Sequence, residues 1–491
     1  MPMGEVDVLM SGMNPPGLPS AIPAEIFREY DLRGLTDSQL TPEVMGLLGR
    51  VLARYYQQAG EWRVLVGRDN RLSSDRLRDA LMENLLRNGM DVVDLGVVTT
   101  PLFYYARVHL GINAGVMITA SHNPPQYNGL KVALGFATIY GQEIQRLRRQ
   151  AEELLAEEQV RGRPTQAEQR GKLQFVDEGP SYLDMLTEKI KLGPRRLKVA
   201  VDCGNGTGSL FAVEYLQRLG CDVIPLYCES DGHFPNHEPD PTVSANLRDL
   251  QKAVVEQEAD VGIGFDGDSD RIGVVDDQGK ILWGDELMVL YWREILPRHP
   301  GAVAITEVKC SQALVEEVER LGGRPLWYKT GHSLIKAKMK ELGAVFTGEM
   351  SGHMFFADEF YGFDDAFYAA GRLLRILSNT SEKLSQMRET IPHYYSTAET
   401  RVPTTEEGKF RVVTALRDEF RGRDGVIDVI EVDGARVVFA DGWALARASN
   451  TQPVIVARCE GKTPEALERI SRVMKDALLR HPEVREFEWA F

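Results

Sequence analysis

Residues 115–128 read Gly-Val-Met-Ile-Thr-Ala-Ser-His-Asn-Pro-Pro-Gln-Tyr-Asn, a short apolar run followed by a polar turn. The apolar run predicts a buried strand, and the two prolines prevent that strand, or a helix, from continuing. Ser121 is therefore expected near the tip of a loop at a strand end. A serine in such a place is a nucleophile, a phosphorylation site or a turn residue, and this loop alone favours the turn residue.

A second apolar run, Val261–Phe265, leads into Asp-Gly-Asp-Ser-Asp-Arg at 266–271. Three carboxylates at alternate positions (Asp266, Asp268 and Asp270) can converge on one hard cation, and oxygen ligands of this kind suit Mg²⁺. A helix–loop–helix calcium site does not fit, because a strand precedes the motif, an arginine replaces the required glycine and an aspartate stands where the bidentate glutamate is expected. A structural aspartate-rich turn remains an alternative. The adjoining arginine favours a phosphate-binding loop, since a guanidinium binds phosphate in a bidentate fork.

Two further loops carry ligand-binding chemistry. Glu349 and Ser351, after the apolar run 344–347, offer a carboxylate and a hydroxyl suited to vicinal sugar hydroxyls; a strand-end turn with one buried histidine is the alternative. The stretch Arg447–Pro453 combines a cation, two hydroxyls and an amide, which is the chemistry of a phosphate nest. It has no Walker glycines, so it is not a nucleotide P-loop.

The first three loops end the three units of an internal repeat, in which two predicted strands precede the strand that carries the loop. These strands are Val64–Asp69 and Gly89–Leu95, Val199–Asp202 and Gly220–Leu226, and Ala302–Ile305 and Gly322–Leu326. With helical segments between many of them, they predict an α/β fold of three repeated domains with mixed, largely parallel sheets. Ligands bind such sheets beyond the carboxyl ends of the strands, where these loops fall. The segment Gly204–Gly208 lacks the spacing of a dinucleotide fingerprint and predicts a turn into a helix.

The last hundred residues differ from the repeat. Val426–Cys459 alternates apolar and polar residues around hairpin signals at Asp433-Gly434 and Asp441-Gly442, and a helical segment, Pro464–Leu479, follows. We therefore expect a C-terminal α+β domain. The expected domains are 1–174 with the serine loop, 175–279 with the metal-binding loop, 280–391 with the sugar-binding loop and 392–491 with the phosphate-binding loop.

Smaller segments also carry predictions. Residues 1–24 are rich in Met, Pro and Gly and read as a loose tail. Residues 142–158 have apolar side chains at helical spacing, typical of a surface helix, and 161–172 read as a linker.

Composition limits the classes of function. A net charge of −15 argues against nucleic-acid binding. No signal peptide and no apolar run near the roughly 18 residues of a membrane span is present, so neither export nor membrane insertion is expected. Five scattered cysteines suit a reducing cytoplasm, and a cytoplasmic monomer or homodimer is expected.

Taken together, these motifs resemble the α-D-phosphohexomutases, in particular the bacterial phosphomannomutase/phosphoglucomutase group. The resemblance covers nearly the whole chain, apart from the tail before about residue 23 and the residues near 158–172. The residues that carry it, in chain order, are Arg28–Gly34, Thr119–Pro124, Asn128–Lys131, Asp266–Arg271, Lys329–Ser333, Gly348–His353 and Arg447–Pro453.

The resemblance implies a heart-shaped molecule around a central cleft and a phosphohexomutase that interconverts the 1- and 6-phosphates of glucose, mannose or both. Ser121 would carry a phosphoryl group, bridged by one Mg²⁺ to Asp266, Asp268 and Asp270, and a hexose 1,6-bisphosphate would be the intermediate and activator. The implied transfer-site residues are Arg33, His122, Lys131, Arg271, Lys309 and His353, with Lys131 and His353 as candidates for the general acid or base. The implied sugar- and phosphate-binding residues are Tyr30, Gly331, His332, Glu349, Ser351, Arg447, Ser449, Asn450 and Thr451. The expected partners are small-molecule sugar phosphates, with no nucleic acid and no membrane.

Three alternatives stay open from the sequence. A phosphoglucosamine mutase is the nearest, although that group usually has glutamine where Met350 stands. A metal-dependent sugar phosphatase would share the serine and the aspartates but would not need the sugar and phosphate loops. A non-catalytic sugar-phosphate sensor would be expected to lose Ser121 or a metal ligand, and none is lost.

Overall fold

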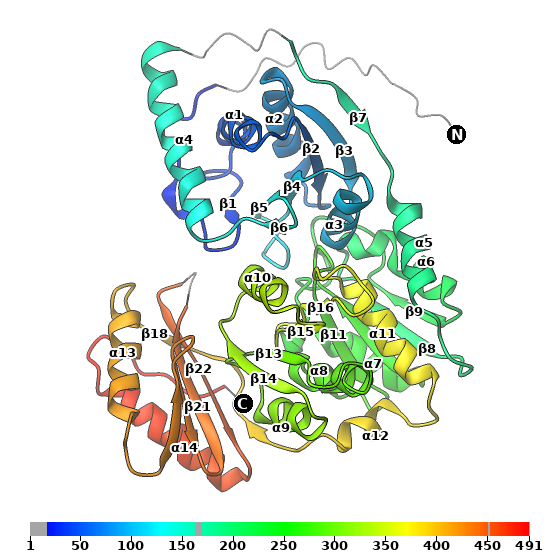
Figure 1. Ribbon diagram of the computed structural model, residues 1–491, viewed down its shortest axis with the longest axis vertical. Coiled ribbons are helices and arrows are strands. Elements are labelled where there is room, and N and C mark those ends of the chain that lie inside the picture. Colours follow the sequence, from blue (N-terminus) through cyan, green and yellow to red (C-terminus); the bar gives the residue numbers. More distant parts are fainter. Residues whose placement is uncertain (1–16, 163–168, 450–451, 491) are drawn as a thin grey trace. The chain divides into compact units, whose positions relative to one another are not determined.

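The structure is a computed structural model that describes residues 17–162, 169–449 and 452–490. The chain divides into two compact units, which are described separately. The first unit contains the residues up to Ile281 together with Phe363–Ser381, and the second contains Leu282–Gly362 together with Glu382–Phe491. The first unit holds two α/β sheets, and the second holds one α/β sheet and one antiparallel sheet (Figure 1).

The first sheet has the strand order β1-β5-β4-β2-β3-β7, with β6 beside β5. Its strands are β1 (Leu32–Leu35), β2 (Arg63–Arg68), β3 (Asp91–Val97), β4 (Ala114–Ile118), β5 (Tyr127–Leu134), β6 (Ala137–Thr138) and β7 (Leu173–Phe175). Its helices are the 3₁₀ turn η1 (Ala24–Ile26), α1 (Pro42–Gln58), α2 (Ser74–Arg87), α3 (Thr100–His109) and α4 (Gln142–Arg161). Helices α1, α2 and α4 bury one continuous apolar core with the sheet.

The second sheet has the order β12-β11-β10-β8-β9. Its strands are β8 (Lys198–Asp202), β9 (Asp222–Leu226), β10 (Val261–Phe265), β11 (Ile272–Asp276) and β12 (Ile281–Leu282). The helical segments around it are α5 (Gly179–Lys189), η2 (Thr207–Leu210), α6 (Ala212–Arg218), η3 (Ser244–Leu247), α7 (Arg248–Glu256) and α11 (Ala366–Ser378).

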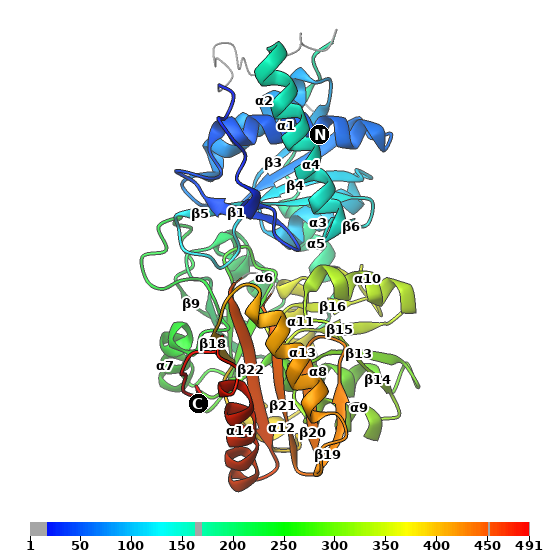
Figure 2. The same ribbon diagram turned by 90° about the vertical axis from the view of Figure 1, so that its left-hand side faces the viewer.

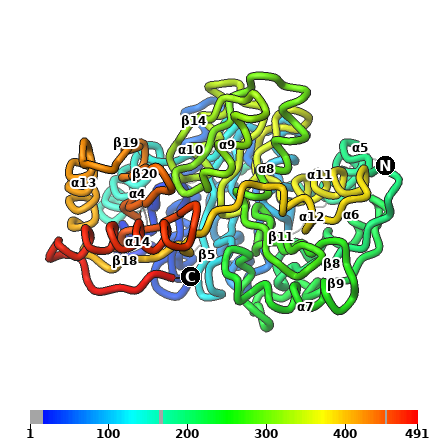
Figure 3. The backbone as a smooth tube through the Cα atoms, turned by 90° about the horizontal axis from the view of Figure 1, so that it is seen from below, coloured from blue at the N-terminus to red at the C-terminus, as the bar shows by residue number. Residues whose placement is uncertain are grey.

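Helices α5, α6 and α11 gather on one side of this second sheet (Figure 3). Aromatic rings join them: Phe367 of α11 contacts Tyr182 of α5 and Tyr215 of α6 with ring centroids 6.2 and 5.8 Å apart. Phe367 also stacks on Phe265, the last residue of β10, at 4.7 Å. Since Phe265 directly precedes the aspartate loop, this packing fixes the strand end from which the loop begins.

The third sheet has the order β14-β13-β15-β16. Its strands are β13 (Val303–Glu307), β14 (Arg324–Tyr328), β15 (Phe346–Gly348) and β16 (Met354–Phe356). Its helices are α8 (Gly284–Ile295), α9 (Gln312–Arg320) and α10 (His332–Leu342), and α12 (Leu384–Glu389) begins the segment that leads to the last domain.

The fourth sheet is antiparallel and follows the order β17-β22-β21-β20-β19, with β18 paired to β22. Its elements are β17 (Tyr395–Ser396), β18 (Thr400–Pro403), α13 (Gly408–Phe420), β19 (Val426–Ile430), β20 (Ala435–Phe439), β21 (Gly442–Ala448), β22 (Val454–Gly461) and α14 (Pro464–Leu479). Both helices cover one face of this sheet and share its apolar core (Figure 2). The two predicted hairpins and the predicted last helix are confirmed.

The three α/β sheets share one arrangement, as the repeat predicts. In each, two neighbouring strands and the strand that precedes the functional loop are parallel. The next strand of the chain then returns antiparallel beside that strand, in the pairs β4/β5, β10/β11 and β15/β16. Each of the three functional loops therefore joins two hydrogen-bonded strands, which gives it short and fixed ends.

Helix α4 is longer than the predicted segment because Glu158 is buried. Its two carboxylate oxygens accept hydrogen bonds of 2.9 and 2.8 Å from Arg50 of α1. These bonds hold the end of α4 against α1, and the helix continues to Arg161. The predicted tail falls mostly on residues 1–16 and part of the predicted linker on 163–168, and both ranges lie outside the described residues.

Candidate functional site

The loop that carries Ser121 is held in a conformation that serine rarely adopts. Ser121 has φ = 50°, in the left-handed region, and it is 4% exposed. Its N–H donates to Thr119 Oγ1 at 2.9 Å. The guanidinium of Arg71, which is itself buried, donates to the carbonyl oxygens of Ser121 and Pro124 at 2.7 Å each and also to those of Asn123 and Tyr127. These contacts hold the strained loop in place.

The aspartate loop meets the Ser121 loop directly within the first unit. Ser121 Oγ donates to Asp266 Oδ2 at 2.6 Å. A Cβ atom at Gly267 would lie 2.4 Å from the carbonyl oxygen of Ser121, so only glycine allows this approach. The pairing of these two loops, expected from the resemblance, is thus present in the geometry.

Asp266, Asp268 and Asp270 are buried and lie together, with one carboxylate oxygen from each within 4.8 Å of the others. Asp268 Oδ2 accepts from Thr100 Oγ1 at 2.7 Å and from Lys131 Nζ at 2.8 Å. Asp268 Oδ1 is buried and makes no hydrogen bond within the part of the chain that the structure describes. A buried carboxylate oxygen is costly without a partner, so the donor set fits a divalent cation.

Burial raises the pKa of Asp266 well above its ordinary value, and the charges of Asp270 and Asp268 raise it further against the opposing charge of Arg271. Burial alone would lower the pKa of Lys131, but the charges of Asp268 and Asp270 outweigh it and raise that pKa well above its ordinary value. The site therefore concentrates negative charge that only cations offset.

The other predicted residues of the first unit lie around these two loops. Arg33, on β1, donates from Nη1 to Asn123 Oδ1 at 2.8 Å, and its Nη2 pairs with Asp31 at 2.5 Å. His122 Nδ1 lies 3.0 Å from Ser121 Oγ. Arg271 follows the carboxylates, and its N–H donates to Asp266 Oδ1 at 3.1 Å. Tyr30 is half-buried in the bend before β1.

In the second unit, the predicted sugar-binding residues form one hydrogen-bonded group. Glu349 is buried, and its Oε1 accepts from the backbone N–H of Gly331 at 2.8 Å. His353 Nδ1 lies 3.0 Å from Glu349 Oε2 and 3.1 Å from Ser351 Oγ. The ring of His332, the first residue of α10, stacks on that of His353 with centroids 5.2 Å apart.

Burial would raise the pKa of Glu349, but the hydrogen bond with His353 and the charges of His353, His332 and Lys309 lower it to about 2. Glu349 is thus a carboxylate at neutral pH. A buried carboxylate that accepts hydrogen bonds but cannot donate them is suited to sugar hydroxyls, which can donate.

The predicted phosphate-binding cation, Arg447, lies at the end of β21. Its Nε donates to Asp433 Oδ2 at 3.0 Å, and the same oxygen accepts from the N–H of Thr330 at 3.1 Å. Asp433 thereby connects the phosphate loop to the segment that leads into α10. Ser449 is buried and accepts from the N–H of Gln452 at 3.3 Å. The predicted residues Asn450 and Thr451 lie outside the described residues.

Lys309 is the second predicted cation of this unit. Its Nζ pairs with Glu399 at 3.2 Å and lies 3.8 Å from Glu307. Burial would lower the pKa of Lys309, yet the charges of Glu307 and Glu399 raise it above its ordinary value. Glu307 Oε1 also accepts from the N–H of Met350 at 2.9 Å, so the lysine is tied to the loop of Glu349.

Sequence reasoning missed Arg71, Thr100 and Asp433, which position the predicted residues. Arg71 and Thr100 follow the ends of β2 and β3, so their place beyond parallel strands is the signal that could have found them. Asp433 was interpreted only as a hairpin residue, because its turn chemistry explains it fully without Arg447.

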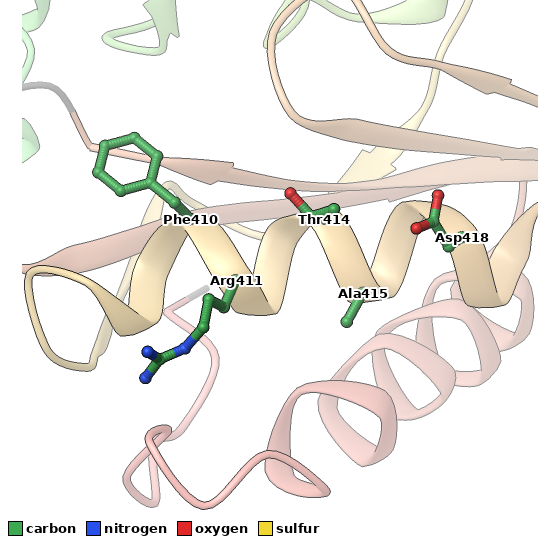
Figure 4. A pocket seen from close by; sticks show the side chains of 5 residues that line it. All are labelled: Phe410, Arg411, Thr414, Ala415 and Asp418. Carbon is green, nitrogen blue, oxygen red and sulfur yellow. The ribbon is translucent and has the colours of Figure 1, made fainter.

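A shallow surface hollow of about 440 Å³ lies along helix α13. Five residues of α13 line it: Phe410, Arg411, Thr414, Ala415 and Asp418 (Figure 4). None of them is a predicted site residue.

No helix in the described part of the chain combines the length and the hydropathy that a membrane span requires.

Comparison with protein families gives four consecutive matches that span most of the chain. They are phosphoglucomutase/phosphomannomutase alpha/beta/alpha domain I at residues 24–157, domain II at 180–279, domain III at 283–395 and the C-terminal domain at 399–477. The serine, aspartate, glutamate and arginine loops each fall in a different one of these domains.

Individual proteins agree with the family match. The phosphomannomutase/phosphoglucomutase of Pseudomonas aeruginosa is 43% identical over 457 residues, which is 93% of this chain and 96% of that protein. The phosphoglucomutase of Neisseria gonorrhoeae is 40% identical over 468 residues, 95% of this chain and 99% of that protein. A phosphoglucomutase/phosphomannomutase family protein from Burkholderia thailandensis has a crystal structure that matches with a TM-score of 0.86 at 38% identity, covering 96% of this chain and 100% of that one. The chain therefore belongs to the bacterial phosphomannomutase/phosphoglucomutase group of the α-D-phosphohexomutases and is a hexose phosphate mutase.

Proposed function

We propose that this enzyme interconverts the 1- and 6-phosphates of glucose and mannose through a phosphoserine at Ser121 and a hexose 1,6-bisphosphate intermediate. The single observation that carries the proposal is the contact of Ser121 Oγ with Asp266 Oδ2 at 2.6 Å, beside two further buried carboxylates. A serine hydroxyl beside three buried carboxylates is suitably placed for a phosphoryl group that shares a cation with them.

Asp266, Asp268 and Asp270 would hold one Mg²⁺, which supplies neutralisation of the charge on a phosphoryl group at Ser121. Two buried features of the chain support this assignment: the Asp268 oxygen described above and the short distances among the three carboxylates. Arg33 and Arg271 would add fixed positive charge around the same serine, as phosphoryl transfer requires.

The burial of Ser121 supports transfer to a sugar over hydrolysis. The residue is 4% exposed, which limits the access of the bulk water that hydrolysis would need. The loops of Glu349 and Arg447 support the same choice, because a phosphatase would need no second phosphate site.

The sugar would be bound by Glu349 and Ser351. His332 would help to distinguish the orientations of the sugar hydroxyls. The phosphate that is not reacting would be bound by Arg447 and Ser449, with Tyr30 and Lys309 also contacting the substrate. Each phosphate must occupy the transfer site in one half of the cycle and the clamp in the other, since the product carries the phosphate on the opposite end of the sugar.

For proton transfer we assign Lys131 and His353. His353 has an orienting carboxylate at 3.0 Å, Glu349, which fixes the direction of the imidazole ring. Lys131 lies between the carboxylates and Thr100 in the first unit, with its Nζ 3.4 Å from Thr100 Oγ1. His122 is the third group of this kind, at 3.0 Å from Ser121 Oγ.

Phosphoglucosamine mutase is the second candidate, and Met350 argues against it. The sulfur of Met350 lies 2.9 Å from Arg458 Nη1, a guanidinium that also pairs with Asp285 at 3.4 Å. A thioether at this position offers only a weak acceptor, so the loop lacks the amide that the glucosamine enzymes present there.

A coupled assay tests the proposal. The enzyme is given the 1-phosphates of glucose, mannose and glucosamine, each with and without glucose 1,6-bisphosphate, and formation of the 6-phosphate is followed. Turnover of glucose and mannose 1-phosphates that rises with the bisphosphate is expected. Preference for glucosamine 1-phosphate would favour the second candidate, and release of inorganic phosphate at the rate of sugar consumption would contradict the mutase.

A further inference from the structure

Two cysteines of the second sheet lie next to each other outside the proposed phosphoryl-transfer site. Cys203 follows β8 and is fully buried, whereas Cys228 lies two residues beyond β9 and is half-buried. Their sulfur atoms are 3.3 Å apart. The strands are parallel neighbours, so the pairing of the sheet fixes both residues at the same edge.

The cysteines begin two loops that contact each other. The first loop, residues 203–210, carries Asn205, whose N–H donates to the carbonyl oxygen of Tyr227 at 2.9 Å and whose Nδ2 donates to that of Glu229 at 2.8 Å. The second loop, residues 227–239, returns a bond from the N–H of Asp231 to the carbonyl oxygen of Asn205 at 3.0 Å. A change at the cysteines therefore reaches both loops.

The first loop supports the metal-binding loop. The N–H and the hydroxyl of Thr207 both donate to the carbonyl oxygen of Gly267 at 3.0 Å. A Cβ atom at Gly208 would lie 2.7 Å from Ser269 Oγ, so the loops are in close contact. Since Gly267 and Ser269 lie between the aspartates, movement of the first loop displaces the carboxylates.

The second loop supports the Ser121 loop through Arg71. The ring of Phe234 lies 5.1 Å from the Arg71 guanidinium, and a Cβ atom at Gly232 would lie 2.3 Å from the carbonyl oxygen of Asn70. Asn70 Nδ2 also donates to Ser230 Oγ at 2.9 Å. Because Arg71 holds the Ser121 loop, a movement of the second loop that shifts Arg71 also shifts Ser121.

We propose that Cys203 and Cys228 form a reversible disulfide that switches off phosphoryl transfer at Ser121. Disulfide bonding requires the two sulfur atoms to approach from 3.3 Å to about 2.05 Å with a defined dihedral angle, and this new constraint acts on the residues from which both loops begin. A shift of about 1 Å between reacting groups is enough to lower a rate about a hundredfold. Oxidation therefore lowers turnover by displacing Ser121 from the aspartates.

The reaction balances with a peroxide as the oxidant. The Cys228 thiolate attacks one peroxide oxygen, the O–O bond breaks, and after protonation the products are a sulfenic acid and water. The sulfur of Cys203 then attacks the sulfenic sulfur, its proton leaves with the hydroxyl as a second water, and the S–S bond forms. Two thiols lose two electrons and two protons, and hydrogen peroxide becomes two waters. A thiol reductant reverses the change.

Cys228 is the cysteine suited to react first. The contact with Cys203 lowers the pKa of the Cys228 thiol despite its burial, whereas the same contact and burial raise the pKa of Cys203 well above its ordinary value. Cys228 is also the more exposed of the two, so a small oxidant reaches it.

The test compares the reduced enzyme with the enzyme treated with hydrogen peroxide. Oxidation should lower the thiol count from five to three, reduce the intact mass by about 2 Da and yield one linked peptide that contains Cys203 and Cys228. The kcat for glucose 1-phosphate should fall at least tenfold, the KM should change little because the sugar and clamp loops lie in the other unit, and dithiothreitol should restore kcat.

Three variants test whether the Cys203–Cys228 disulfide causes the loss of activity. Cys228→Ser should keep the kcat of the reduced enzyme and resist peroxide, whereas Cys221→Ser, a control in the same domain, should lose activity as the wild type does. If Cys228→Ser folds poorly, Cys203→Ser takes its place and should likewise keep the kcat of the reduced enzyme and resist peroxide. The proposal is overturned if no linked peptide forms, if the linked enzyme keeps its kcat, or if Cys228→Ser is inactivated at the wild-type rate.

Discussion

Replacing Arg71 with methionine should remove the main support of the Ser121 loop while keeping a side chain of similar length. The guanidinium now serves four backbone carbonyl oxygens, of Ser121, Asn123, Pro124 and Tyr127, and pairs with Asp69 at 3.1 Å. Methionine can donate to none of them. We expect the loop to relax from the left-handed conformation that Ser121 holds at φ = 50°.

The expected loss of stability follows from the burial of the ion pair between Arg71 and Asp69. The Arg71 side chain is fully buried and that of Asp69 is 2% exposed, and breaking a buried ion pair by removing one partner costs about 3–5 kcal/mol. Each carbonyl oxygen left without a donor adds about 1–3 kcal/mol where water cannot reach it. A displacement of about 1 Å at Ser121 should lower kcat about a hundredfold.

The assay combines steady-state turnover of glucose 1-phosphate with thermal unfolding. Arg76→Met, in helix α2 shortly after Arg71, is the matched control. Its side chain is 47% exposed, and its ion pair with the exposed Asp37 at 3.2 Å is worth about 0–1 kcal/mol. Arg71→Lys should fall between the two, because it keeps the charge but not the fork of donors. Wild-type kcat and stability in Arg71→Met would show that Arg71 does not support the Ser121 loop.

Three further predictions concern the other loops. Arg447→Ala should weaken substrate binding about ten- to a hundredfold, since a hydrogen bond to a charged group is worth about 1.5–3 kcal/mol. The variant should also depend on added bisphosphate. Unchanged affinity, together with no release of the bisphosphate in a trapping experiment, would exclude Arg447 as part of the phosphate clamp. Asp268→Asn should weaken metal affinity in calorimetry, and a chelator should stop turnover reversibly; full activity in excess chelator would rule out the metal site. Glu349 has its folded-state pKa lowered from 4.5 to about 2, so its contribution of about 3 kcal/mol is present above pH 4.5 and is lost as the pH falls toward 2. Urea unfolding should therefore show a steeper loss of stability in this range for the wild type than for Glu349→Gln, and equal slopes would contradict the assignment.

Local patterns were sufficient to predict the repeated α/β domains and the loops of Ser121 and Asp266. Each of these loops follows an uninterrupted apolar run and contains residues that stop a strand, so the strand end is visible in a few residues. The helix Pro464–Leu479 was predicted with its observed limits, because Thr463 caps its first turn and its apolar residues follow one face.

Contacts between distant segments could not be predicted in the same way. Arg71 reaches the Ser121 loop across about fifty residues, and Thr100 reaches Asp268 across 168. The burial of Glu158 depends on Arg50, 108 residues away. The local sequence pattern therefore indicated an exposed, charged helix end. Such pairings follow from how strands and helices stack, which the spacing of residues within one segment does not encode.

Whether Ser121 carries the phosphoryl group can be measured from the intact mass of the enzyme. The purified enzyme is incubated with glucose 1,6-bisphosphate, and its mass and its phosphorylated peptide are compared with those of Ser121→Ala. The wild-type enzyme should gain one phosphate on the peptide that contains Ser121. Ser121→Ala should gain no phosphate there and should lack wild-type turnover. Phosphorylation of Ser121→Ala to the same extent, with normal turnover, would contradict this role of Ser121.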